Sequence, residues 1–150
     1  MQIALYEPEI PPNTGNIARL CAATKTPLHL IEPLGFLVDD KHLRRAGLDY
    51  WPHVDVSIHS NFEVFLDTVK PERLVLASAK AATAHHKFQF HSNDVLLLGP
   101  ETRGLPQDLL EQYPTCVRIP IWGKVRSLNL STATGILLFE ALRQTEGLPD

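Results

Sequence analysis

Short apolar runs alternate with stretches of helical periodicity along the chain of 150 residues. Most of these runs are apolar at consecutive positions, which is typical of strands that are covered on both faces of a sheet. The strands that this pattern predicts are 3–6, 28–31, 54–58, 74–77, 95–98 and 117–119. Because they alternate with helical stretches, the sequence indicates an α/β fold, a mainly parallel sheet with helices on both faces.

Helical periodicity recurs in several stretches, and two of them follow an asparagine that can cap a helix. Asn13 and Asn61 are the expected N-caps of the helices that begin after them. The predicted helices are 14–24, 39–46, 62–69, 107–112 and 130–143. The sequence contains no linker, internal repeat or low-complexity segment, so we expect one domain over residues 1–150.

The first predicted helix has a single apolar stripe. Ile17, Leu20, Cys21 and Thr24 follow the spacing of a helix face that packs inward. Because Cys21 belongs to this stripe, packing is its expected role. Arg19 lies roughly 200° around the helix from Ile17 and therefore leaves the stripe.

The last predicted helix is apolar over most of its surface. Its main stripe consists of Leu130, Thr134, Leu137, Leu138 and Ala141. Ile136 and Phe139 add a second apolar face. Because a helix that is apolar nearly all round is buried on more than one side, we expect another subunit to cover the second face and predict a homodimer.

Composition and charge exclude several kinds of protein. Apolar residues make up 44% and charged residues 21%, as in a soluble globular protein. No apolar run could span a membrane and no secretory signal is present, so we expect a cytoplasmic protein with no membrane partner. At a formal net charge of −3, a nucleic acid would have to be bound by a local basic patch.

Familiar nucleotide and metal motifs are missing from the sequence. It has no G-x-G-x-x-G after the first predicted strand, no P-loop and no G-x-S-x-G, which disfavours dinucleotide oxidoreductases, nucleoside triphosphatases and esterases. His85, His86 and His91 lack a carboxylate or cysteine partner, and the two cysteines lack metal-ligand spacing. We expect exposed loop histidines and no metal.

The segment 13–19 follows the first predicted strand and carries candidate chemistry. Asn13 can cap a helix or present its amide to a ligand, and Arg19 is either a solvated charge or a functional cation. For an isolated arginine the solvated charge is the simpler interpretation. Its place after a strand makes a ligand-binding role a closer alternative, because open α/β sheets bind ligands at the carboxyl ends of their strands.

The loop 98–106 also leaves a strand end. Gly99 and Gly104 allow the backbone to approach a ligand closely, and Glu101 offers an acceptor. An ordinary turn with Pro106 at the start of the next helix is the alternative interpretation.

The loop 119–131 is more specific. Ser127, Asn129 and Ser131 alternate with leucines at a helix start, and capping accounts for only one of the three. Together with the glycines and prolines of the loop 98–106, this pattern predicts a pocket built largely from main chain.

The segment 39–51 combines basic and aromatic residues. Lys41, Arg44 and Arg45 fall on neighbouring helical positions, where they could contact phosphates, while Tyr50 or Trp51 could stack on a base. A solvated amphipathic helix beside a packed aromatic pair is an equal alternative.

Three motifs in order along the chain resemble those of a known family. They are Asn13-Thr14-Gly15-Asn16-x-x-Arg19, Gly99-Pro100-Glu101-Thr102-Arg103-Gly104, and Ile119-Pro120 followed by Ser127-Leu128-Asn129-Leu130-Ser131. These are similar to the motifs of the SPOUT superfamily of RNA 2′-O-methyltransferases. The segments 6–12, 31–36 and 44–50 resemble the branch that methylates the wobble nucleotide, a cytidine or modified uridine, of leucine tRNAs.

The resemblance implies a deep C-terminal trefoil knot whose loops bind S-adenosyl-L-methionine. Knotted chains are very rare, so only the resemblance predicts one here. By motif position, the cofactor-binding residues are Ala77, Gly99, Glu101, Ile119, Ser127 and Leu128. The resemblance also implies a homodimer through the last helix, with tRNA as the partner and no metal.

The superfamily assigns the activation of the ribose hydroxyl to the motif arginine, which is Arg19 here. A guanidinium stays charged in proteins and is a poor general base. We therefore expect Arg19 to stabilise the developing oxyanion, with Asn13 and Asn129 orienting the reacting groups.

RNA recognition is expected on the surface of the dimer. The expected RNA-binding residues are Lys41, Arg44, Arg45, Arg103, Lys124 and Arg126. Phe139 and Thr132 depart from the tyrosine and asparagine that are usual in the family. Methylation of another tRNA or rRNA site, or a non-catalytic RNA-binding protein, are the alternative functions.

Overall fold

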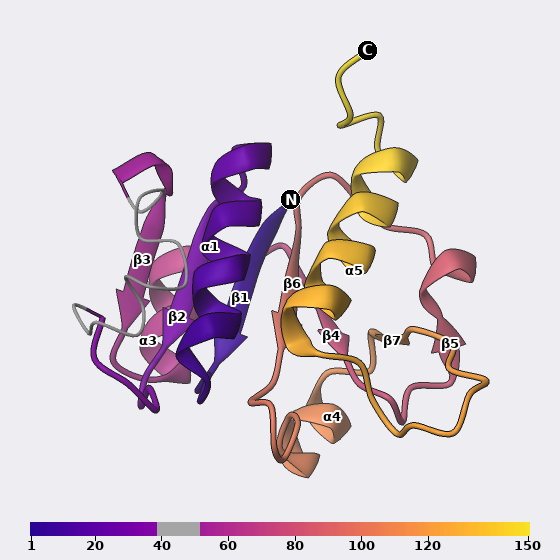
Figure 1. The fold of residues 1–150 in the computed structure, drawn as a ribbon, viewed down its shortest axis with the longest axis horizontal. Helices are drawn as coiled ribbons and strands as arrows, with labels where there is room; N and C mark the ends of the chain where they lie inside the picture. The colour runs from indigo at the N-terminus through magenta and orange to yellow at the C-terminus, as the bar shows by residue number, and fades with distance from the viewer. Residues whose placement is uncertain (39–51) are drawn as a thin grey trace.

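The computed structural model describes residues 1–38 and 52–150 and is built around a seven-stranded sheet (Figure 1). The strand order is β3-β2-β1-β6-β4-β7-β5, and all the described pairings are parallel. The strands are β1 (Gln2–Tyr6), β2 (Leu28–Ile31), β3 (Val56–His59), β4 (Arg73–Ala77), β5 (Thr83–Ala84), β6 (Asp94–Leu98) and β7 (Cys116–Arg118). The predicted parallel sheet is confirmed, and β5 is the strand that the sequence pattern missed.

The described helices are α1 (Pro11–Thr24), α3 (Phe62–Val69), η2 (His85–Lys87), α4 (Gln107–Gln112) and α5 (Leu130–Gln144). The helices α1, α3, η2 and α4 lie between strands, and α5 follows the last strand. The predicted helix 39–46 lies outside the described residues. His85 and His86 lie in η2, where His85 is half-buried, so the expectation of exposed loop histidines is wrong for His85.

The two predicted N-caps have different outcomes. Asn61 caps α3, since its side chain accepts a hydrogen bond from the backbone N–H of Val64 at 2.8 Å. The prediction for Asn13 is wrong, because α1 begins at Pro11 and places Asn13 inside its first turn. Prolines fit the first turn of a helix, where the missing N–H would have no partner in the helix.

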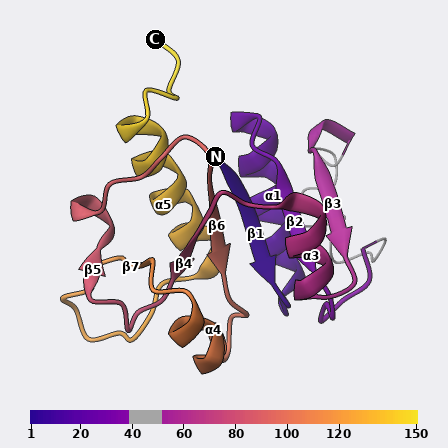
Figure 2. The same cartoon turned by 180° about the vertical axis from the view of Figure 1, so that it is seen from behind.

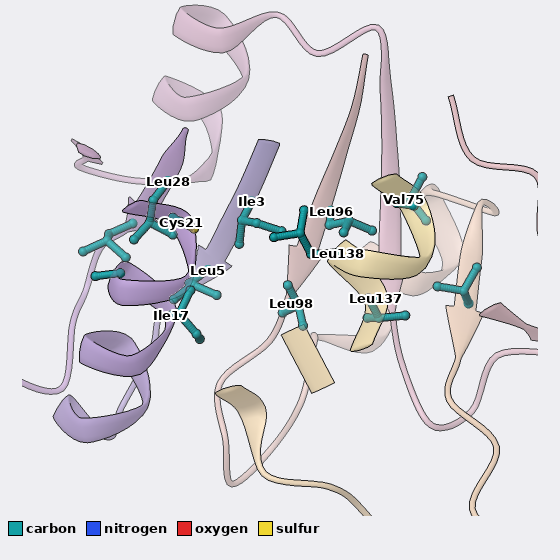
Figure 3. Packing of buried hydrophobic residues seen from close by; sticks show 14 of the residues in the cluster. Ile3, Leu5, Ile17, Cys21, Leu28, Val75, Leu96, Leu98, Leu137 and Leu138 are labelled. Carbon is teal, nitrogen blue, oxygen red and sulfur yellow. The ribbon is translucent and has the colours of Figure 1, made fainter. Parts of the chain in front are cut away.

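Helices α1 and α5 cover one face of the sheet and pack against each other (Figure 1). Figure 3 shows Ile17 and Cys21 of α1 and Leu137 and Leu138 of α5 beside the side chains of the central strands. Cys21 is buried, as predicted, and Arg19 is exposed, as its departure from the stripe predicted. The residues of this cluster that come from the sheet are Ile3, Leu5, Leu28, Leu30, Val75, Leu96, Leu98 and Val117.

The opposite face of the sheet packs against α3 and α4. Phe65 of α3 and Leu109 of α4 are buried against the strand residues that alternate with those of the first face. Figure 2 shows α3 on this side, behind the strands as drawn in Figure 1. With both faces covered, the central strand β6 is buried at every position, and its residues from Val95 to Leu98 are all apolar. In the part of the chain that the structure describes, no helix is both long and apolar enough to cross a membrane.

Three polar residues form a hydrogen-bonded chain across neighbouring strands of the α3 face. Gln2 of β1 accepts from His29 of β2, with 2.6 Å between Oε1 and Nε2. His29 Nδ1 lies 3.0 Å from Nε2 of His59 on β3. Since an amide oxygen only accepts, His29 carries its proton on Nε2 and accepts with Nδ1 from His59. Burial lowers the pKa of His29 to about 4 and lowers that of His59, which favours the neutral form of both rings.

We expect this buried pair to make the fold sensitive to acid. An unfolded histidine takes up a proton near pH 6.5, whereas the folded His29 does so only near pH 4. The unfolded state then binds more protons in this window, so the free energy of unfolding falls as the pH falls. When the pH has fallen to about 4, His29 has lowered the free energy of unfolding by roughly 3 kcal/mol.

Denaturant unfolding at a series of pH values measures this loss. His29→Gln removes the titrating ring and should flatten the pH dependence, whereas His91→Gln, at an exposed position, should leave it unchanged. An unchanged slope in His29→Gln would show that other groups cause the sensitivity.

Candidate functional site

A cavity of about 550 Å³ lies beyond the carboxyl ends of β4, β6 and β7. Three loops that follow these strands form most of its wall, and α1 and α5 close it on one side. The main lining segments are 77–80, 98–105, 117–119 and 126–130. The loops predicted to build a pocket from main chain therefore lie around one cavity, at the sheet edge where parallel α/β folds bind ligands.

The loop after β6 folds back on itself so tightly that only glycine fits at its start. A Cβ on Gly99 would lie 2.4 Å from the backbone nitrogen of Leu105 and 2.5 Å from the carbonyl carbon of Gly104. Gly104 has a φ of +67°, and its N–H donates to the carbonyl of Pro100 at 2.9 Å. The two glycines thus allow the main chain to form this part of the cavity wall.

Glu101 fastens this loop to the start of α1. One carboxylate oxygen accepts from the N–H of Glu9 at 2.9 Å, and the other accepts from the N–H of Ile10 at 2.6 Å. The second oxygen also accepts from Asn13 Nδ2 at 3.3 Å. Ile10 is the N-cap residue of α1 and has no side-chain cap of its own, so Glu101 supplies the negative charge that a helix N-terminus favours.

Asn13 and Asn129 continue the connection from α1 to α5. Asn129 Nδ2 donates to Asn13 Oδ1 at 2.9 Å. Asn129 Oδ1 caps α5, accepting from the N–H of Ser131 at 2.9 Å and from the Ser131 hydroxyl at 2.6 Å. Asn13, Glu101 and Asn129 come one from each of the three motifs, so one hydrogen-bonded chain joins all three.

A second set of contacts holds the same loop from its outer side. Glu9 accepts from the N–H of Thr102 at 3.0 Å and from its hydroxyl at 2.8 Å, and these hydrogen bonds lower the pKa of Glu9. Arg103 forms an ion pair with Glu7 at 3.0 Å. The segment before α1 and the loop 99–104 thus hold each other in place.

All the residues predicted to bind the cofactor line the cavity. The structure brings together Ala77, Gly99, Glu101, Ile119, Ser127 and Leu128. Asn13, Asn129, Arg103 and Arg126 also line it. Lys124 is exposed and lies two residues from Arg126 in the same loop.

Arg19 is a predicted catalytic residue that lies outside the cavity lining. It is exposed on α1 and is not among the residues that line the cavity, so its catalytic role stays a prediction. It lies six residues beyond Asn13, roughly 9 Å along the helix axis. Lys41, Arg44, Arg45, Tyr50 and Trp51 lie outside the described residues.

Sequence reasoning missed the part of the wall that follows β4. Ser78, Ala79 and Lys80 line the cavity there. Arg118 of β7 supports this segment, since its guanidinium donates to the carbonyls of Ala81 at 3.1 Å and of Ala82. The segment has no glycine or proline, and its position after a strand end was the only signal in the sequence.

The charges around the cavity favour an anionic partner. The charged lining residues are Glu101, Lys80, Arg103, Arg118 and Arg126. Glu101 is held by the start of α1 and Arg103 is paired with Glu7, and the other three charged lining residues are all positive. Across residues 1–38 and 52–150, no cluster of histidine, cysteine, aspartate or glutamate side chains could hold a metal ion.

Residues 1–139 match the SpoU rRNA Methylase family, and the chain belongs to this family. It is 50% identical over 151 residues to the tRNA (cytidine(34)-2'-O)-methyltransferase of Yersinia pestis, covering 96% of this chain and 93% of that protein. The family that the three motifs predicted is therefore confirmed.

Solved structures show the same relationship. One, described as giving structural insights into the 2-OH methylation of C/U34 on tRNA, has a TM-score of 0.93 and 47% identity, and covers 98% of this chain and 97% of that chain. An rRNA methyltransferase from Sinorhizobium meliloti, solved with AdoMet bound, has a TM-score of 0.84 and 29% identity. This match covers 95% of the present chain and 55% of that one.

Proposed function

We propose that this protein is an S-adenosyl-L-methionine-dependent tRNA ribose 2′-O-methyltransferase that acts on the wobble nucleotide, position 34, of leucine tRNAs. The observation that carries the proposal is the convergence of three loops, which hold the family motifs, on one cavity. The relatives named for methylation of cytidine 34 support the position, since they match this chain over nearly its whole length. The choice of leucine tRNAs rests on the resemblance of the motifs.

The cavity suits a ligand of the cofactor's kind. The volume of the cavity lies in the usual range of small-molecule sites. A side chain at Gly99 would clash with the backbone of Gly104 and Leu105, so main chain forms this part of the wall. S-adenosyl-L-methionine, when bound, supplies an electrophilic methyl group on a sulfonium. Ala77, Gly99, Ile119 and Leu128 would hold it mainly through main-chain groups and apolar side chains. The trefoil crossing of these loops stays a prediction of the resemblance.

The hydrogen-bonded residues act by fixing the wall of this cavity. The Asn13 amide is occupied on both sides, by Glu101 and by Asn129, and the Asn129 oxygen caps α5. We therefore assign Asn13 and Asn129 a positioning role, in which they orient the loops that align the methyl group with the ribose hydroxyl. Arg19 remains the proposed stabiliser of the oxyanion.

The exposure of Arg19 supports a site that two subunits complete. Ile136 and Phe139 of α5 are 37% and 46% exposed, on the face turned away from the buried stripe. Covering this face with a second copy removes apolar surface from water. We propose a homodimer through α5 in which Arg19 of the partner subunit reaches the cavity.

Phe139→Asp should disrupt this dimer, because it places a charge in an apolar contact. We expect light scattering to report a monomer for Phe139→Asp and a dimer for the parent protein. Glu63→Gln, an exposed change on α3 at the opposite face of the sheet, is the control and should remain dimeric. A Phe139→Asp protein that stays dimeric would place the interface elsewhere.

Mapping the methylated nucleotide tests the proposed activity. The protein is incubated with isotope-labelled S-adenosyl-L-methionine, purified leucine tRNAs and rRNA fragments, and the products are digested and analysed by mass spectrometry. Label on the ribose of nucleotide 34 supports the proposal. Label only on another tRNA site or on rRNA would overturn the assigned position, and absence of transfer to any RNA would favour the non-catalytic alternative.

A further inference from the structure

The loop between β7 and α5 carries a tryptophan that is almost fully exposed. Trp122 has 94% of its surface accessible, the highest value among the large apolar side chains found exposed in the described parts of the chain. Its neighbours from Gly123 to Ser127 are exposed as well. A large aromatic ring in water is an unfavourable arrangement for an isolated chain, so this side chain is a candidate for contact with a partner.

The loop that carries Trp122 also forms part of the cavity. Ile121 on one side of it and Arg126, Ser127 and Leu128 on the other line the cavity wall. Trp122 itself is absent from that lining, and its side chain stands outside the cavity. Figure 1 shows the segment between β7 and α5 looping out past β5 before it returns to the start of α5.

The charges on this loop are all positive. Between β7 and Asn129 the sequence contains Lys124 and Arg126 and no acidic residue. Neither cation forms an ion pair with a carboxylate of residues 1–38 or 52–150. An exposed aromatic ring flanked by two cations has the chemistry that binds single-stranded nucleic acid, where bases stack on the ring and phosphates contact the cations.

We propose that Trp122 is a stacking platform for an unpaired base of the tRNA anticodon loop next to the nucleotide being methylated, with Lys124 and Arg126 contacting the adjacent phosphates. This inference rests on the proposed function. The inference adds a residue that selects and positions the RNA. An aromatic face beside the cavity would hold the anticodon loop of the tRNA while the target ribose enters the cavity. Trp122 takes no part in the chemical step.

Three variants in the full-length protein test the platform. Trp122→Ala removes the ring, Trp122→Phe keeps an aromatic face, and Val125→Ala shortens another exposed apolar side chain of the same loop, 63% accessible, without touching an aromatic group. The probe is an anticodon stem-loop RNA of a leucine tRNA, and its affinity is measured by filter binding with and without S-adenosyl-L-homocysteine.

We expect Trp122→Ala to weaken RNA binding about 10- to 100-fold, the range of one lost base stack. In methylation assays the KM for the RNA should rise by a similar factor, with kcat changed much less. Trp122→Phe should recover most of the affinity, and Val125→Ala should bind as the parent protein does. Cofactor affinity by calorimetry and the mass by light scattering should be the same in all four proteins.

Other results would overturn the proposal in recognisable ways. Loss of cofactor affinity in Trp122→Ala would assign the ring to the cofactor site, and a change of mass would assign it to the contact between subunits. Equal RNA affinity of Trp122→Ala and the parent protein would show that the ring does not stack on a base. These outcomes differ from failure of the proposed function, in which the parent protein itself transfers no methyl group to tRNA.

Discussion

Arg19→Ala is expected to reduce methyl transfer by a factor on the order of 1,000, close to background, while cofactor affinity stays nearly unchanged. The guanidinium is proposed to stabilise negative charge as the ribose hydroxyl gives its proton to water or to a substrate phosphate, and alanine provides no positive charge there. Cofactor affinity should survive because Arg19 does not line the cavity of its own chain. Single-turnover methylation measures the first effect and calorimetry with S-adenosyl-L-methionine the second.

Lys25→Gln is a matched control, because it removes another exposed cation just after the end of the same helix. It should methylate at the parent rate. A large loss of cofactor affinity in Arg19→Ala would contradict the assignment, since Arg19 would then be part of the cofactor site. Wild-type methylation by Arg19→Ala would remove Arg19 from the mechanism altogether.

Mixing two inactive variants shows whether Arg19 acts on the cavity of its own chain or on that of the partner chain. In a mixed dimer of Arg19→Ala and Gly99→Ala chains, the first chain keeps an intact cavity and the second keeps an intact Arg19. If Arg19 acts on the partner's cavity, one site of each mixed dimer is complete and activity returns. If Arg19 acts within its own chain, the mixture stays inactive.

Gly99→Ala is expected to abolish cofactor binding measurable by calorimetry and to remove methylation with it. The added Cβ would lie 2.4 Å from the Leu105 nitrogen and 2.5 Å from the Gly104 carbonyl carbon. Both are backbone atoms, so the clash cannot be relieved by a side-chain rotation, and the loop must open. Opening the loop also pulls on Glu101, which caps α1, so thermal unfolding should occur at a lower temperature.

Gly123→Ala is the matched control, because a Cβ at Gly123 would meet no atom within 4 Å. It should keep the parent's cofactor affinity and thermal stability. Gly99→Ala protein that binds S-adenosyl-L-methionine with parental affinity would show that the tight loop is not part of the cofactor site.

The sheet and the two covered faces could be predicted from the sequence because buried parallel strands are apolar at consecutive positions. β6 shows this from Val95 to Leu98, where four consecutive apolar residues are buried. β5 could not be predicted because Thr83–Ala84 is too short to show any pattern. The sequence predicts the start of α1 too late because Asn13 is a good N-cap residue, although the first turn of a helix also accommodates Pro11 and Pro12.

The sequence predicts the parts of the site that form short motifs, and it does not reveal contacts between residues that are far apart in the chain. Gly99, Ser127 and Asn129 belong to motifs whose composition stands out in the sequence, and the structure places them around one cavity. Glu101 caps a helix that begins 90 residues earlier in the chain, which no local pattern reveals. The cavity that Arg19 faces depends on the side of α1 that it occupies and on the proposed second subunit, neither of which its motif reveals.

A crystal structure of the protein with S-adenosyl-L-homocysteine and an anticodon stem-loop RNA tests the central claim most directly. We expect the cofactor product among the three loops, in contact with Gly99, Ile119 and Leu128, with the ribose of nucleotide 34 facing it and Arg19 of the partner subunit beside the 2′-oxygen. A ligand bound outside this cavity, or a ribose that no arginine of either α1 approaches, would contradict the account.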